Sequence, residues 1–248
     1  MGLIKEKVNK IVDSYDKYIQ CEKMDDNTLI KKYDFDINNK IVVDEDQYLL
    51  ITCNDEIIDS INEAGIYTFK EESKMDVMNI YFINTSNISD NKFKTEKAIQ
   101  YFDSNLNIMV DIKCYGEYII KIIDPIKFYK YNKNTNSNSF KNLFLSKFLE
   151  NLESTLSKLS EKKLSYDAIP YSTDEITKVF NENLKLFNED CGVNIISVSI
   201  ASVTPTIESF ELIKQFYKQN NDNQNICPYC ETELPVGAKF CFKCGKKI

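Results

Sequence analysis

The chain of 248 residues contains no histidine and only six glycines. Histidine is the commonest general base, so its absence removes the usual acid–base residue and leaves cysteine as the ligand for any soft metal. None of the glycines lies in a GxGxxG or GxxxxGK[ST] pattern, so the sequence predicts no phosphate-binding loop. Both absences argue against catalysis, and we expect a protein that is not an enzyme.

Long apolar runs and basic tracts are missing as well. No stretch of about 18 apolar residues occurs, so no segment is expected to cross a membrane. The start of the chain lacks the apolar run of a signal peptide, which predicts a cytoplasmic protein. The formal net charge is −7, and without clusters of basic residues nucleic acid is not expected as a general partner.

Four cysteines form two CxxC pairs near the end of the chain, at Cys227, Cys230, Cys241 and Cys244. Two such pairs on facing turns of a short hairpin are typical of a tetrahedral zinc site with four sulfur ligands. Four thiolates leave no open coordination position, so the pattern predicts one structural Zn²⁺. Two alternatives stay open from spacing alone: a pair of disulfides, and an iron site of the rubredoxin type. Gly245 gives the second turn a permissive backbone.

The other cysteines are Cys21, Cys53, Cys114 and Cys191, and they follow no framework pattern. We interpret them as buried, reduced thiols. Carboxylate pairs such as Asp44 with Asp46 and Glu71 with Glu72 lie in polar, turn-like contexts, so they are read as solvated surface.

Apolar side chains between residues 3 and 20 recur with helical spacing, and this pattern predicts an amphipathic helix over residues 1–22. Its polar face carries four lysines against three acidic residues. Two interpretations follow: the apolar face packs on the domain, or it associates weakly and reversibly with an anionic lipid surface.

The rest of the chain predicts an α+β fold, because strand-like runs come first and helices follow. Strands are expected at 41–43, 48–53, 67–69, 79–83, 106–114, 118–123 and 196–200. Tyr115-Gly116-Glu117 is read as a break between two of them. Helices are expected over residues 144–159 and 206–217. A third helix is expected between them, beginning at a capping box at Ser172–Glu175 and ending at a helix stop at Cys191-Gly192.

The order of several short motifs resembles the SPFH (Band 7) family, which includes stomatin, prohibitin and flotillin. Residues 124–128 match its DP-x-x-F pattern, and residues 192–195 match the G-(I/V)-x-(I/V) entry to its last strand. Upstream, residues 43–47 and 64–67 resemble its V-x-E-x-Q and pG-x-Y positions. With the terminal cysteines, the chain is similar to small bacterial SPFH proteins that carry a zinc ribbon, often labelled virion core protein-like.

The resemblance implies an SPFH domain over 25–205, a short helix and linker over 206–226, and a zinc ribbon over 227–248. It also implies a self-associating scaffold or adaptor near the inner membrane surface, with membrane-stress or phage-shock-type proteins as partners. The long coiled coil and membrane hairpin of many relatives are absent from these residues. A nucleic-acid-associated ribbon is the alternative. Tyr229, Phe240 and Phe242 could stack on bases, but we expect them to pack the ribbon's small core.

Overall fold

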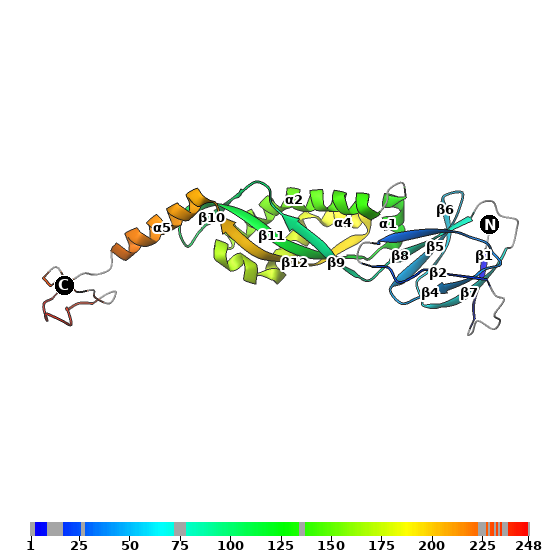
Figure 1. Ribbon diagram of the computed structural model, residues 1–248, viewed down its shortest axis with the longest axis horizontal. Helices are drawn as coiled ribbons and strands as arrows, with labels where there is room; N and C mark the ends of the chain where they lie inside the picture. The colour runs from blue at the N-terminus through cyan, green and yellow to red at the C-terminus, as the bar shows by residue number, and fades with distance from the viewer. Residues whose placement is uncertain are drawn as a thin grey trace.

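The structure is a computed structural model that describes residues 3–8, 17–25, 28–71, 78–133, 137–222, 227, 229–230, 232, 234 and 238–247. It has a β-rich N-terminal lobe, a long sheet covered by helices, and a last helix that leads away from that sheet (Figure 1). The strands described are β1 Leu3–Val8, β2 Tyr18–Gln20, β3 Ile30–Asp34, β4 Lys40–Val43, β5 Gln47–Cys53, β6 Glu56–Ile61, β7 Gly65–Glu71, β8 Met78–Asn84, β9 Asn87–Lys94, β10 Ile99–Asp103, β11 Ile108–Ile122 and β12 Val193–Pro205. The helices described are α1 Pro125–Asn132, α2 Ser137–Glu161, the 3₁₀ helix η1 Tyr166–Tyr171, α3 Thr173–Asn183, α4 Lys185–Cys191 and α5 Ile207–Asp222. The predicted α+β class is confirmed.

The N-terminal lobe consists of two four-stranded sheets, with strand orders β1-β7-β4-β2 and β3-β8-β5-β6. Strand β5 is buried on both faces, which explains its nearly continuous apolar sequence. Leu49 and Ile51 face the core shared with the first sheet, whereas Leu50 belongs to the larger core under the helices. The second sheet therefore joins the two cores of the molecule.

The third sheet is built around β11, a strand of 15 residues that pairs with β10 and β9 along one side and with β12 along the other. The predicted break at Tyr115-Gly116-Glu117 is wrong, because the strand continues through it with only a shift of register. A Cβ atom at Gly116 would lie 2.1 Å from the carbonyl oxygen of Ser199 and 2.9 Å from the Phe93 ring. This glycine is thus required for close packing inside the sheet.

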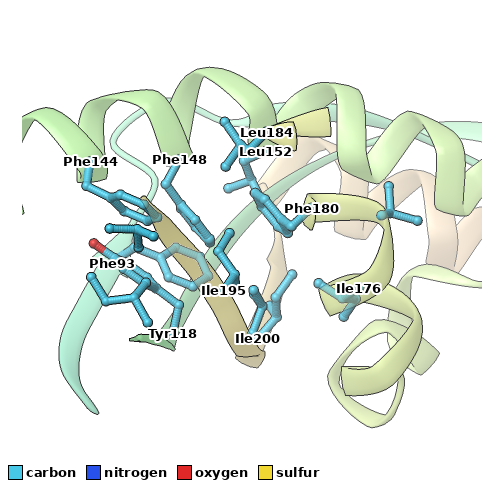
Figure 2. Close-up of a cluster of buried hydrophobic side chains, with 14 of the residues drawn as sticks. Phe93, Tyr118, Phe144, Phe148, Leu152, Ile176, Phe180, Leu184, Ile195 and Ile200 are labelled. Atoms are coloured by element: carbon cyan, nitrogen blue, oxygen red, sulfur yellow. The ribbon is translucent and has the colours of Figure 1, made fainter. Parts of the chain in front are cut away.

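One face of the third sheet is covered by α2 and α3, and aromatic rings fill the space between them (Figure 2). The Phe148 ring stacks on Phe180 at a centroid distance of 4.2 Å and on Tyr118 at 4.6 Å. Along α2 the buried positions follow the expected helical spacing. The predicted helix over 144–159 is confirmed, and it begins seven residues earlier, at Ser137.

Side chains of α3 cover the outer edge of β12. The Asn181 side-chain amide donates to the Ile195 carbonyl at 2.8 Å, and its oxygen accepts from the Ile195 N–H at 3.3 Å. Thr177 Oγ1 accepts from the Val198 N–H at 2.8 Å. These contacts satisfy backbone groups that a neighbouring strand would otherwise pair with, so the N-terminal half of β12 is closed to strand addition.

The Asp124-Pro125 pair starts α1 as expected, since the Asp124 carboxylate accepts from the Lys127 N–H at 2.9 Å. The helix stop at Gly192 is also confirmed, with a left-handed φ of 68°. The start of α1 and the end of α4 are in contact, because the N–H groups of Ile123 and Asp124 both donate to the Gly192 carbonyl. The resemblance motifs at 124–128 and 192–195 therefore lie side by side.

The predicted N-terminal amphipathic helix is wrong over the described part of residues 1–22. Residues 3–8 form β1, which pairs antiparallel with β7, and residues 18–20 form β2. Ile4 and Val8 are four residues apart, a spacing that puts side chains on one face of a helix and equally of a strand. Pairing with β7 selects the strand for residues 3–8. An ion pair between Lys5 and Asp59 at 2.8 Å also stabilises this strand. Residues 9–16 lie outside the described part of the chain.

Two further helix predictions need correction. The capping box at Ser172–Glu175 does not form, because the Ser172 hydroxyl donates back to the Ala168 carbonyl and Glu175 pairs with Lys162. The helix expected from there to Cys191 is divided at Leu184 into α3 and α4. Helix α5 ends at Asp222, beyond the expected end at 217.

Candidate metal centre

The four predicted cysteines converge in the C-terminal module. Their sulfur atoms all lie within 4.8 Å of one another. Cys227 Sγ lies 3.4 Å from Cys244 Sγ, and Cys230 Sγ lies 3.5 Å from Cys241 Sγ, so each close pair joins the two CxxC turns. No other group of three or more potential metal ligands occurs among the residues that the structure describes.

Short backbone hydrogen bonds shape the two turns that hold the sulfurs. In the first turn, the Cys230 N–H donates to the Cys227 carbonyl at 3.3 Å. In the second, the Gly245 N–H donates to the Cys241 carbonyl at 2.8 Å, and Gly245 takes a left-handed φ of 72°. The Cys241 N–H in turn bonds the Lys246 carbonyl. Gly245 therefore has the turn-closing role that its position predicted.

The geometry fits a tetrahedral zinc ion. Zn–S bonds of about 2.3 Å in a tetrahedron separate the sulfurs by about 3.8 Å, which lies within the range found here. Disulfide bonds would need sulfurs about 2.05 Å apart, and all four cysteines are free thiols in the structure. The four cysteines are thus positioned to bind one zinc ion in a closed, structural site.

The thiols of this cluster influence one another's ionisation. Hydrogen bonds with the Thr232 side chain and backbone lower the pKa of Cys230 to about 6. The pKa of Cys244 is raised, since burial and the three neighbouring cysteine side chains outweigh a hydrogen bond with the Lys246 backbone. Four thiols this close cannot all ionise on their own, and a divalent cation removes that conflict.

Aromatic side chains of the ribbon do not pack its core, contrary to our expectation. Tyr229, Phe240 and Phe242 are 58%, 61% and 73% exposed. The small core instead contains Cys227, Leu234 and Cys241, with Cys230 and Ala238 packed against it. Cysteine side chains occupy the centre of the module, and the bulky rings beside them lie at the surface.

Three of the four remaining cysteines are buried as predicted, and the fourth is not. Cys21, Cys114 and Cys191 are buried, and Cys53 is half-buried. Burial raises the pKa of Cys114 to about 12 and that of Cys191 to about 11, so both are protonated at neutral pH.

The turn at residues 44–47 contains a feature that the sequence did not reveal. Asp44, Glu45 and Asp46 line a hollow of 340 Å³ together with residues of the β8–β9 turn and the segment before β3. The buried Gln47 fixes the turn, because its side-chain oxygen accepts from the Asp44 N–H and its amide donates to the Cys21 carbonyl. In the sequence these acidic residues are adjacent, but only the fold makes their surface concave.

A long mixed β/α domain followed by a closed four-cysteine module defines a class of protein: a folded domain with a structural zinc ribbon. Among the helices described, none is long and apolar enough to span a membrane.

Comparison with family models gives the family. Residues 33–216 match the SPFH domain-Band 7 family, and residues 226–248 match a zinc-ribbon domain. The chain therefore belongs to the SPFH domain-Band 7 family and carries a C-terminal zinc ribbon. A search of curated proteins found no match.

Proposed function

We propose that this protein is a non-enzymatic scaffold or adaptor that self-associates and organises protein partners, with the zinc ribbon as its interaction module. One observation carries the proposal: an SPFH domain is joined to a ribbon whose metal site is closed to substrates and whose aromatic rings face solvent. A closed site supplies structure rather than chemistry. Exposed aromatic residues are the side chains that most often anchor protein interfaces.

The place of action in this proposal is the inner membrane surface, reached from the cytoplasm. The expected lipid-binding N-terminal helix is replaced, over residues 3–8, by a strand paired with β7. We therefore assign membrane attachment to a partner protein of the membrane-stress or phage-shock type, as the family resemblance suggests.

Self-association is tested by light scattering of the purified, zinc-loaded full-length chain over a range of concentrations. A scaffold gives a mass well above the 28.9 kDa of one chain. A strict monomer at high micromolar concentration, with and without lipid vesicles, would refute this part of the proposal. Affinity purification with identification of co-purified material then tests the partner class: membrane proteins support the scaffold, whereas RNA or polymerase contradicts it.

Nucleic-acid binding through the ribbon is the second candidate. The observation in its favour is that Tyr229, Phe240 and Phe242 are exposed beside lysines, as in surfaces that stack bases. Four lysines in the ribbon are offset by two glutamates and by the net −2 of a zinc–thiolate centre, so the electrostatic attraction for phosphate is small. Titration with labelled single-stranded RNA and DNA at two salt concentrations decides between the candidates.

A further inference from the structure

The exposed side of the ribbon combines aromatic rings with exposed lysines. Phe240 and Phe242 stand on either side of the buried Cys241, and the Lys246 ammonium lies 4.1 Å from the centre of the Tyr229 ring. Lys239, Lys243, Lys246 and Lys247 are exposed, and none forms an ion pair within the described part of the chain. We call Tyr229, Phe240, Phe242 and these four lysines the ribbon face. Such a surface suits a partner that is both acidic and hollowed.

The molecule itself carries a surface of that kind, the hollow at the β4–β5 turn. Its lining residues are Lys23, Met24, Asp44, Glu45, Asp46, Gln47, Asn84 and Ser86, which gives three carboxylates against one lysine. The three carboxylates form no ion pair among the described residues. Its volume of 340 Å³ is about twice that of a cavity of roughly 150 Å³ known to hold benzene. An aromatic ring is therefore small enough to enter the hollow, and the lysines beside it bring ammonium groups next to the carboxylates, although the zinc-loaded ribbon as a whole carries no net charge.

The ribbon cannot reach the hollow of its own chain. Helix α5 starts beside the beginning of β11, because the Thr206 N–H donates to the Asp111 carbonyl. Asn87, which follows the hollow in the chain, pairs with Lys121 near the other end of β11. Ten strand residues separate the two points by about 33 Å, and α5 adds about 24 Å directed away from the N-terminal lobe (Figure 1). The four residues 223–226 extend at most about 14 Å.

We infer that the ribbon face of one molecule docks in the acidic hollow of a second copy. This inference rests on the proposed function, since it specifies how the scaffold self-associates. The two surfaces are different and lie far apart on one chain, so each copy uses its ribbon on one neighbour and offers its hollow to another. Such a head-to-tail contact produces an open chain or a ring, whose smallest form is a two-membered ring in which each ribbon docks in the other copy's hollow.

The test uses zinc-loaded full-length end variants, each of which disables either the ribbon face or the hollow. Phe242→Ala with Lys243→Glu removes a ring and reverses a charge on the ribbon face, and Glu45→Lys reverses a charge in the hollow. Matched controls are Tyr171→Ala, an aromatic residue 89% exposed elsewhere, and Glu96→Lys, an exposed glutamate far along the chain. Zinc content and the far-UV spectrum confirm that every variant is folded.

Masses from light scattering give the result. We expect assemblies of two or more copies for the wild type and both controls, and at least a tenfold weaker self-association for each end variant alone. Mixing the two end variants leaves one intact ribbon face and one intact hollow, so the mixture should form a dimer of twice 28.9 kDa and nothing larger. The double variant with Lys243→Glu and Glu45→Lys in one chain should regain the self-association that each single variant lacks, because its reversed charges attract one another.

Three outcomes overturn the inference, and they differ in meaning. Wild-type assembly that neither end variant weakens shows that the scaffold associates through another surface, so the docking is wrong while the proposed function stands. A monomeric wild type overturns both. Loss of single-stranded RNA binding in the ribbon variant, with assembly unchanged, shows that the ribbon face binds nucleic acid instead.

Discussion

Removing one zinc ligand should unfold the ribbon and leave the SPFH domain intact. We consider Cys241→Ser, which replaces a buried sulfur at the centre of the module, and chelation of the wild type, which removes the metal itself. Cys53→Ser is the control, because this half-buried thiol lies in β5, outside the ribbon.

The expected loss of stability can be worked out by comparing the contribution of zinc with the other interactions that stabilise the described residues of the ribbon. Among the ribbon residues that the structure describes, Leu234 is the buried aliphatic residue of the core, and its burial contributes about 1.5–3 kcal/mol. Four backbone hydrogen bonds of the two turns add about 0.5–1.5 kcal/mol each. Ordering the backbone of residues 238–247 alone costs about 10–20 kcal/mol. Structural zinc in such modules contributes about 10–16 kcal/mol, so the metal decides whether the ribbon folds.

Hydrogen–deuterium exchange with peptide-level mass spectrometry locates the change. In the zinc-loaded wild type, the amides of Cys241 and Gly245 should be protected, since both donate backbone hydrogen bonds at 2.8 Å. After chelation, and in Cys241→Ser, we expect protection to be lost throughout 227–247 but unchanged in α2 and β11. Cys53→Ser should behave like the wild type.

A ribbon that keeps its amide protection when elemental analysis finds neither zinc nor iron would refute this reasoning. It would mean that packing of the described residues, or contacts with another copy, stabilise the module without metal. Loss of protection in β11 as well would also contradict it, because the domain has a separate core.

Three further changes test the packing of the domain. Phe148→Ala should lower the free energy of unfolding by about 3–5 kcal/mol in urea titrations, because a fully buried ring that packs against three other rings is lost; a loss below about 1.5 kcal/mol would contradict the packing described. Gly116→Ala should cost about 1–3 kcal/mol, whereas Gly65→Ala, whose Cβ would meet the flexible Lys7 side chain at 2.6 Å and the edge of the Tyr67 ring at 3.3 Å but no backbone atom, should shift the thermal midpoint far less; equal shifts would speak against the close approach. The pKa of the Cys114 thiol is about 12 in the folded protein, against an ordinary value of 9. Above pH 9 the unfolded chain therefore loses this proton while the folded protein keeps it. The free energy of unfolding should then fall by about 1.4 kcal/mol for each unit by which the pH rises. The fall should be shallower in Cys114→Ala, and an unchanged slope measured between pH 8 and 11 would exclude this cause.

The metal centre and the main helices could be predicted from the sequence because their determinants are local. The CxxC spacing places Cys227 with Cys230 on one turn and Cys241 with Cys244 on another before any other contact is known. Strong helical periodicity similarly gave α2, and Asp124 forms its cap with a residue three positions away. Each of these features depends on chemistry within a few residues.

Other features depend on pairing between distant segments, and the sequence alone did not decide them. The spacing of Ile4 and Val8 fits a helix and a strand equally well, and only the free edge of β7 selects the strand. Gly116 suggested a break because its role is set by Ser199, which is remote in the chain. Strand and helix patterns of short segments are ambiguous until a partner supplies hydrogen bonds or covers a face.

The surface of the molecule was decided by tertiary structure in the same way. Sequence determined that Tyr229, Phe240 and Phe242 lie beside the cysteines, but not that the cysteines take the centre of the module and leave the rings exposed. It also determined that Asp44, Glu45 and Asp46 are adjacent, while the β8–β9 turn, 40 residues further along the chain, makes them line a hollow. Exposure and concavity are properties of the packed chain, because they depend on which distant segments cover each side chain and which leave it open.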